Sequence, residues 1–145
     1  MINIKTEEEI KYMKEAGHLN YLTREYIKTL IKPGVTIKEL QMETISFLAE
    51  NCLKEGLINS KEEIGNYYFH GVSHHIGLDT HDPYPRYQGT LKEGMIISCE
   101  PGLYFEELGI GVRIEDDILV TKDGNINLSE DIIKEVEDIE NFMNK

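Results

Sequence analysis

Four of the five histidines of this 145-residue chain fall within twelve residues, in the segment His70-Gly-Val-Ser-His-His-Ile-Gly-Leu-Asp-Thr-His81. Packing alone explains such a cluster poorly, because imidazole binds metals and exchanges protons near neutral pH. His70 and His74 are four residues apart, which on a helix would face one metal ion. Gly71 and Gly77 disfavour a helix here. We therefore expect a metal-binding or catalytic role, with the geometry supplied by a loop and a strand.

A first carboxylate, Glu100, follows the apolar segment 95–99. The alternation of a β-strand would place Ser98 and Glu100 on one face of a sheet and Ile97 and Cys99 on the other. Taken alone, a glutamate in this position is more often a surface carboxylate paired with a cation.

A second carboxylate, Glu115, lies in the segment 111–117. The same alternation places Arg113 and Glu115 on one face, while Val112 and Ile114 point to the core. For Glu115, as for Glu100, the alternative is a surface carboxylate paired with a cation.

Considered together, one imidazole and two carboxylates on neighbouring strands form a hard nitrogen and oxygen ligand set. Such a set suits Mn, Co, Fe or Zn and needs no thiolate. Arg113 would orient a ligating carboxylate. His81, seven residues after His74, would donate a proton to the reacting group or accept one from it.

The order and spacing of three motifs resemble the Xaa-Pro aminopeptidase and prolidase family, whose fold is the pita-bread fold. The motifs are His-Gly-x-x-His-x-x-Gly-Leu-Asp-x-His-Asp, Glu-Pro-Gly-x-Tyr and Gly-Val-Arg-Ile-Glu-Asp-Asp. The turn at 32–40 is also similar to the family, and the tail at 136–143 favours its aminopeptidase branch. The resemblance covers about residues 31–143, and residues 1–30 resemble a generic first helix of these enzymes.

The resemblance implies a metal-dependent peptidase that hydrolyses the peptide bond before proline, in substrates with proline at the second position. In that family two metal ions hold the attacking hydroxide. Residue by residue, it implies metal ligands at His74, Glu100 and Glu115, and catalytic roles for His70 and His81 on the substrate side and for Arg113 beside a ligand.

The sequence departs from the family at its other two ligands, which are aspartates on a hairpin ahead of the helices. The first aspartate here is Asp79, so we expect this hairpin to be absent, with one weakly bound divalent ion or none. Three hypotheses stay open. The chain is a peptidase-like hydrolase or one subunit of it, a pseudo-enzyme or binding module that retains the fold, or a truncated product without a present role. Whether it is an enzyme is therefore undecided.

Two capping boxes, Thr6 with Glu9 and Thr36 with Glu39, predict two helices, the first ending at 32–34 and the second at Gly56. Apolar spacing predicts their buried stripes, which are Leu19, Leu22, Tyr26 and Leu30 on the first helix and Ile45, Leu48, Ala49, Cys52 and Leu53 on the second.

Short β-rich segments follow and predict strands at 67–69, 95–100, 103–105, 111–115, 118–120 and 126–128. From Ser129 to the end we expect a short terminal helix or a docked tail, because Ile132, Ile133, Val136 and Ile139 have helical spacing. The order of elements predicts an α+β class, with two antiparallel helices (1–56) packed on an antiparallel β-sheet (66–128). The resemblance implies that this is half of a pita-bread fold, and we expect residues 1–145 to form a single truncated pita-bread domain. A lone half would expose an apolar face, so we expect a homodimer or a complementing half.

The net charge of −12 argues against nucleic acid and anionic membrane partners, which require basic surfaces. No apolar run approaches the roughly 18 residues of a membrane span. The first residues lack the features of a signal peptide. The two cysteines are far apart and lack CxxC spacing, which favours a reducing cytoplasm over a disulfide framework.

Overall fold

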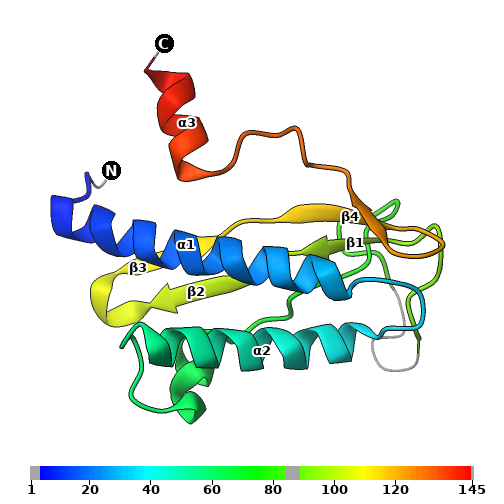
Figure 1. Ribbon diagram of the computed structural model, residues 1–145, viewed down its shortest axis with the longest axis horizontal. Coiled ribbons are helices and arrows are strands. Elements are labelled where there is room, and N and C mark those ends of the chain that lie inside the picture. The colour runs from blue at the N-terminus through cyan, green and yellow to red at the C-terminus, as the bar shows by residue number, and fades with distance from the viewer. Residues whose placement is uncertain (1–3, 84–88, 145) are drawn as a thin grey trace.

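The computed structural model describes residues 4–83 and 89–144, in which two long helices pack on one side of antiparallel strands (Figure 1). α1 (Glu7–Leu30) and α2 (Ile37–Lys54) run antiparallel, as predicted. Both start at the predicted capping boxes. The Thr6 N–H donates to Glu9 Oε2 at 2.7 Å, and the Glu9 N–H donates to Thr6 Oγ1 at 3.2 Å. The second box repeats this pattern at the start of α2.

The strands form two antiparallel sheets, which confirms the predicted α+β class. Their order is β1-β4-β5 in one sheet and β2-β3 in the other. The strands are β1 (Ile96–Cys99), β2 (Gly102–Phe105), β3 (Ile110–Arg113), β4 (Asp116–Val120) and β5 (Asn125–Asn127). A single 3₁₀ turn, Glu106–Leu108, joins β2 to β3.

The predicted strand at 67–69 is wrong. This segment follows a 3₁₀ helix, Lys61–Asn66, and is irregular. Tyr67 accepts one bond, from the Tyr104 N–H at 2.9 Å. Tyr68 is buried while its neighbour Phe69 is 69% exposed. The aromatic run therefore reflects side-chain packing around one buried tyrosine rather than a sheet ladder.

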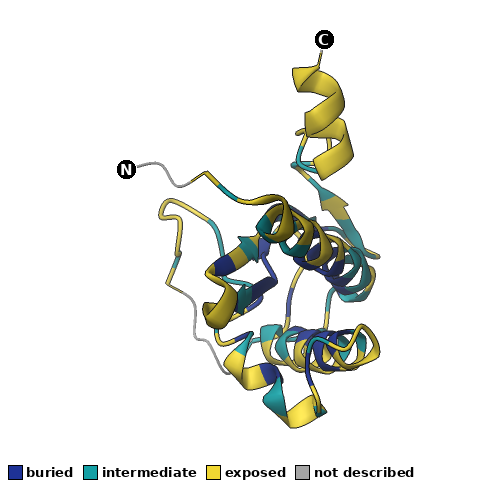
Figure 2. Cartoon of the chain, turned by 90° about the vertical axis from the view of Figure 1, so that its left-hand side faces the viewer, coloured by how far each residue is buried: buried dark blue, intermediate teal, exposed yellow. Residues whose placement is uncertain are grey.

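Strands β1 to β4 form one long, bent hairpin. β1 pairs with β4 and β2 pairs with β3, and both ladders keep the same register, with Cys99 opposite Asp116 and Gly102 opposite Arg113. The hairpin is therefore two ladders separated by a short interruption. Buried segments of the hairpin and of the two helices face one another (Figure 2). The core side chains that the hairpin contributes are Ile97, Cys99, Leu103, Phe105 and Ile118.

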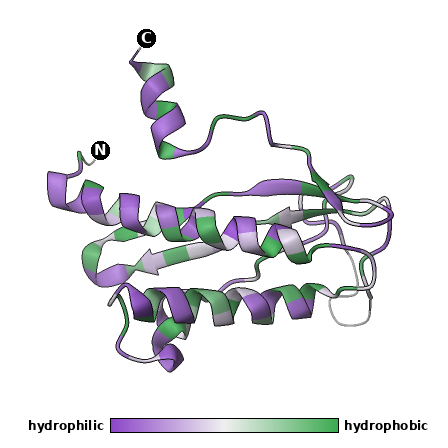
Figure 3. Ribbon diagram, in the orientation of Figure 1, coloured by the Kyte–Doolittle hydropathy of each residue, from purple (hydrophilic) through white to green (hydrophobic). Residues whose placement is uncertain are grey.

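The buried stripe of α1 differs from the prediction. Leu19 is buried as expected, but Leu22, Tyr26 and Leu30 are only partly buried. The face turned to the strands includes three buried polar residues instead, and α1 is correspondingly mixed in hydropathy (Figure 3). These are Asn20, Thr23 and Arg24.

On α2 the prediction holds for Leu48, Ala49 and Cys52. It is wrong for Ile45 and Leu53, which are 38% and 37% exposed at the edges of the stripe.

The chain ends in α3 (Val136–Met143), which lies apart from the sheets and is exposed along its length (Figure 2). It starts later than Ser129, so Ile132 and Ile133 precede it. A salt bridge of 3.0 Å from Lys14 Nζ to Glu140 Oε1 connects it to α1. Within the described ranges, no helix has the length and apolar content needed to cross a membrane.

Both thiols are expected to be unreactive in the native protein. Burial raises the pKa of Cys52 to about 11 and that of Cys99 to about 12. Because the thiolate is the reactive species, neither cysteine should react with a disulfide reagent at pH 8 within minutes, whereas two thiols per chain should react in denaturant. Absorbance of the released chromophore measures this. A native thiol that reacts at the rate of free cysteine would contradict the packing of β1 and α2.

Candidate metal centre

Two glutamates lie opposite each other at the interruption of the long hairpin. Glu100 follows β1 and Glu115 precedes β4. Because the register is the same on both sides of the interruption, these two residues are cross-strand partners. Directly opposed residues point to the same face, here the face away from α1. Like charges in that relation are destabilising, so the site favours a cation between the carboxylates.

His74 reaches the same face from a neighbouring segment that runs along the other edge of β1. The Ser98 N–H donates to the His74 carbonyl at 2.9 Å, and the Glu100 N–H donates to the Val72 carbonyl at 2.8 Å. An isolated bridge also pairs His75 with Ile97. The glycine-rich sequence is therefore extended here rather than helical, as expected from Gly71 and Gly77.

The three predicted ligands come together in space. Nε2 of His74 lies 3.0 Å from Oε1 of Glu100 and 3.8 Å from Oε1 of Glu115. One ligand atom from each residue lies within 4.8 Å of the other two. Since metal–ligand bonds are about 2.0–2.2 Å, two ligands of one ion lie roughly 3–4.2 Å apart. A small closing movement of the side chains would fit this geometry.

The hydrogen bonds of His74 leave Nε2 as the free ring nitrogen. Nδ1 donates to the His75 carbonyl at 3.1 Å, so in the neutral imidazole Nε2 carries a lone pair. Nε2 faces a carboxylate oxygen of Glu100 at 3.0 Å, so both groups would stabilise a metal cation bound at this point. A backbone carbonyl bound to the second ring N–H is also the usual support of a metal-binding histidine.

Ser98 connects the histidine to the first glutamate. Its Oγ accepts the His74 N–H at 2.9 Å and donates to Glu100 Oε1 at 3.1 Å. Glu100 is only 8% exposed, so this bond fixes a nearly buried carboxylate. Sequence reasoning placed Ser98 on the correct face but gave it no role.

The electrostatics of the site are dominated by its two carboxylates. Burial, followed by the negative charge of Glu100, raises the pKa of Glu115, and the positive charges nearby only partly oppose this. Arg113 Nε lies 3.8 Å from Glu100 Oε2 and is half exposed. The sequence prediction that Arg113 shares the face of the glutamates is consistent with this contact. A divalent ion would relieve the remaining repulsion.

The two other predicted histidines have different surroundings. The ring of His81 packs against that of His74, with centroids 4.3 Å apart. His70 instead accepts a hydrogen bond at Nε2 from the Tyr104 hydroxyl at 2.9 Å. A Cβ at position 102 would meet His70 Nε2 at 2.6 Å, so only Gly102 fits beneath this ring. Tyr104 is the tyrosine of the Glu-Pro-Gly-x-Tyr motif, but the sequence could not show that its hydroxyl contacts His70.

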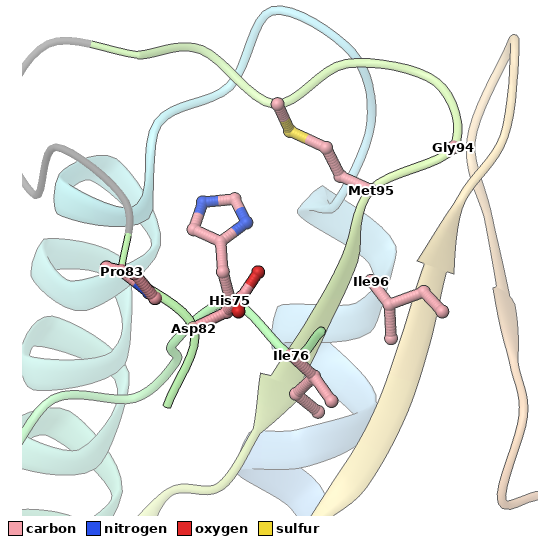
Figure 4. A pocket seen from close by; sticks show the side chains of 7 residues that line it. All are labelled: His75, Ile76, Asp82, Pro83, Gly94, Met95 and Ile96. Atoms are coloured by element: carbon pink, nitrogen blue, oxygen red, sulfur yellow. The ribbon is translucent and has the colours of Figure 1, made fainter. Parts of the chain in front are cut away.

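A shallow pocket of about 260 Å³ lies beside this site but does not include the three ligands. Its lining comes from the loop 75–83 and from the start of β1 (Figure 4). His75 and Asp82 are its titratable residues. Burial lowers the pKa of His75 while the charge of Asp82 opposes the shift. Glu100 and Glu115 do not line this pocket, so it is not the candidate metal centre.

Comparison with known proteins shows the family of the chain. Residues 11–122 match the model of metallopeptidase family M24. Xaa-Pro aminopeptidase 1 of Streptomyces coelicolor is 37% identical over 134 residues, which cover 78% of this chain and 27% of that protein. The chain thus spans under a third of that relative's length.

Two solved structures show the same fold. A candidate aminopeptidase P from Bacillus anthracis superposes with a TM-score of 0.87 and 51% identity, over 90% of this chain and 31% of that one. Aminopeptidase P of Escherichia coli with the inhibitor Pro-Leu superposes with a TM-score of 0.82 and 32% identity, over 92% of this chain and 34% of that one. These similarities confirm the predicted pita-bread architecture as a partial domain.

Proposed function

The chain belongs to metallopeptidase family M24, and from this premise we propose that His74, Glu100 and Glu115 bind a divalent metal ion. We propose further that these residues contribute to hydrolysis of the peptide bond before a proline at the second position of a peptide. The relatives named Xaa-Pro aminopeptidase support the reaction class.

One observation carries the proposal. A histidine lone pair and two opposed carboxylates converge on one point, with only the half-exposed Arg113 as a contacting cation among the described ion pairs of the glutamates. Two negative groups and a lone pair stabilise each other only around a positive centre. The ligand set of one imidazole nitrogen and two carboxylates suits Mn, Co, Fe or Zn.

A bound divalent ion would supply Lewis acidity, which lowers the pKa of a water molecule and stabilises a developing oxyanion. The chain's own residues would do the rest. His81 packs against His74 and would transfer a proton to or from the leaving group. Tyr104 holds the His70 ring on the same face, where it would contact the substrate. Arg113 would hold Glu100 in its ligating orientation.

The proposal covers these 145 residues, which span under a third of the aminopeptidases that they resemble. With three ligands, we expect one weakly bound ion and slow turnover. A second copy or a complementing chain, in the cytoplasm, would supply further parts of the site.

Metal binding and cleavage should be measured together on the purified chain. Equilibrium dialysis with Mn²⁺ or Co²⁺, followed by metal analysis, should give one ion per chain. A tripeptide with proline at the second position should be cleaved slowly, and the same peptide with alanine at that position more slowly still. Absence of bound metal at millimolar concentration would contradict the proposal and favour a binding module that retains only the fold.

A further inference from the structure

Three polar residues on the sheet-facing side of α1 are almost completely buried. Asn20 is 1% exposed, and Thr23 and Arg24 are 0% exposed. Buried polar groups require hydrogen-bond partners. Thr23 finds its partner within the helix, because its hydroxyl donates to the Leu19 carbonyl at 2.7 Å. Asn20 and Arg24 instead reach out to the hairpin.

The contacts of these two residues end next to the two glutamates of the candidate metal centre. Asn20 Nδ2 donates to the carbonyl of Pro101, and Asn20 Oδ1 accepts from Arg24 Nε at 3.2 Å. Arg24 Nη1 donates to Asp116 Oδ2 at 3.1 Å. Pro101 directly follows Glu100 and Asp116 directly follows Glu115. Asn20 therefore binds the backbone carbonyl next to Glu100, and Arg24 binds the side chain next to Glu115. We call Asn20 and Arg24, which are bonded to each other, the buried relay.

The buried relay contacts the hairpin at the point where its two strands do not pair with each other. Pairing is interrupted between the two ladders at Glu100 and Pro101, and Pro101 has no N–H to donate. The Glu100 N–H donates to the Val72 carbonyl at the other edge of β1, and not across the hairpin. Cross-strand spacing at this point therefore depends on bonds from outside the hairpin, and α1 supplies them from the opposite face.

Asp116 is itself firmly anchored. Besides Arg24, Lys28 Nζ lies 3.3 Å from Asp116 Oδ2, and Lys134 Nζ lies 3.0 Å from Asp116 Oδ1. The Ser129 hydroxyl donates to the same Oδ1 at 3.2 Å. The relay is thus a fixed support rather than one flexible pair.

We propose that Asn20 and Arg24 are positioning residues of the metal centre, which set the separation of the Glu100 and Glu115 carboxylates by holding Pro101 and Asp116. This inference rests on the proposed function of the two glutamates and His74 as ligands. Neither α1 residue contacts a ligand atom, and both act through the residue that follows a glutamate.

The test compares Asn20→Leu with Thr23→Val in the full chain. Asn20→Leu keeps the number and branching of the side-chain heavy atoms and removes both bonds, whereas Thr23→Val removes an equally buried hydroxyl that has no link to the hairpin. Mn²⁺ affinity, measured by electron paramagnetic resonance at a protein concentration where both variants are folded, should weaken at least tenfold in Asn20→Leu and less than twofold in Thr23→Val. The visible spectrum of bound Co²⁺, which reports ligand geometry, should change only in Asn20→Leu.

Equal affinity and identical Co²⁺ spectra in Asn20→Leu and the unmodified chain would overturn the inference. If Asn20→Leu does not fold, Asn20→Asp replaces it, because an aspartate retains the acceptor for Arg24 and loses the donor to Pro101. The same tenfold loss is then expected, and its absence counts against the inference.

Failure of the proposed function can be distinguished from failure of this inference. If the unmodified chain binds no metal, the ligand assignment fails, and the crystal structure of metal-free Asn20→Leu decides the positioning. A changed separation of the Glu100 and Glu115 carboxylates, relative to the metal-free unmodified chain, supports the inference, and an unchanged separation contradicts it.

Discussion

Glu115→Gln is expected to weaken divalent metal binding by more than about 100-fold, since even residues that only support a metal ligand contribute about 10- to 100-fold. The substitution keeps the size of the side chain but removes one of two opposed carboxylates. Isothermal titration with Mn²⁺ measures the effect. Asp79→Asn is the matched control, because Asp79 lies in the histidine segment but outside the three-ligand group, and it should change the affinity less than twofold.

The same variant should not lose folding stability in the absence of metal. Two like charges opposite each other in a hairpin are destabilising, and the pKa of Glu115 is raised by burial and by the charge of Glu100. Urea denaturation of the metal-free protein should therefore show an equal or slightly higher free energy of unfolding. A loss of both stability and affinity would mean that Glu115 is a structural residue.

Asp116→Ala is expected to lower the free energy of unfolding by about 3–5 kcal/mol, the usual cost of breaking a buried ion pair from one side. Asp116 and Arg24 are both completely buried, and the carboxylate is also bound by Lys28 and Lys134. Removing the carboxylate leaves these cations without their shared partner. Urea denaturation near neutral pH gives the value.

Asp117→Ala provides the comparison, because Asp117 is the next residue of β4 and points to the opposite face. We expect a change below about 1 kcal/mol there, as is usual away from buried networks. Equal losses in the two variants would show that the strand, rather than the buried ion pair, accounts for the stability.

Much of the fold could be predicted because its signals are local. The capping boxes at Thr6 and Thr36 fixed both helix starts, since each motif satisfies its own backbone groups. Alternation of apolar residues predicted β1 and β4 to within one or two residues. The segment 67–69 was mistaken for a strand because aromatic residues favour strands and buried loops alike.

The candidate site could be predicted only in its composition. The sequence predicted that His74, Glu100 and Glu115 converge, and the structure brings their ligand atoms within 4.8 Å. Their role as ligands stays a prediction, as do the homodimer and the cytoplasmic location. Spacing alone could not reveal the shared register of two ladders separated by Pro101, which is what places the glutamates opposite each other.

The buried polar face of α1 was missed for a physical reason. Helix stripes are recognised by apolar residues, and Asn20 and Arg24 are polar residues whose partners lie 81 and 92 positions away. No local pattern can predict such bonds. Apolar spacing therefore predicts a stripe through Leu22 and Tyr26, which are only partly buried.

Anomalous diffraction from crystals grown with Mn²⁺ tests the ligand assignment most directly. The account predicts an anomalous peak about 2.0–2.3 Å from Nε2 of His74 and from one carboxylate oxygen each of Glu100 and Glu115. A peak bound instead by His75 and Asp82, or no peak at a Mn²⁺ concentration that saturates the solution titration, would contradict it.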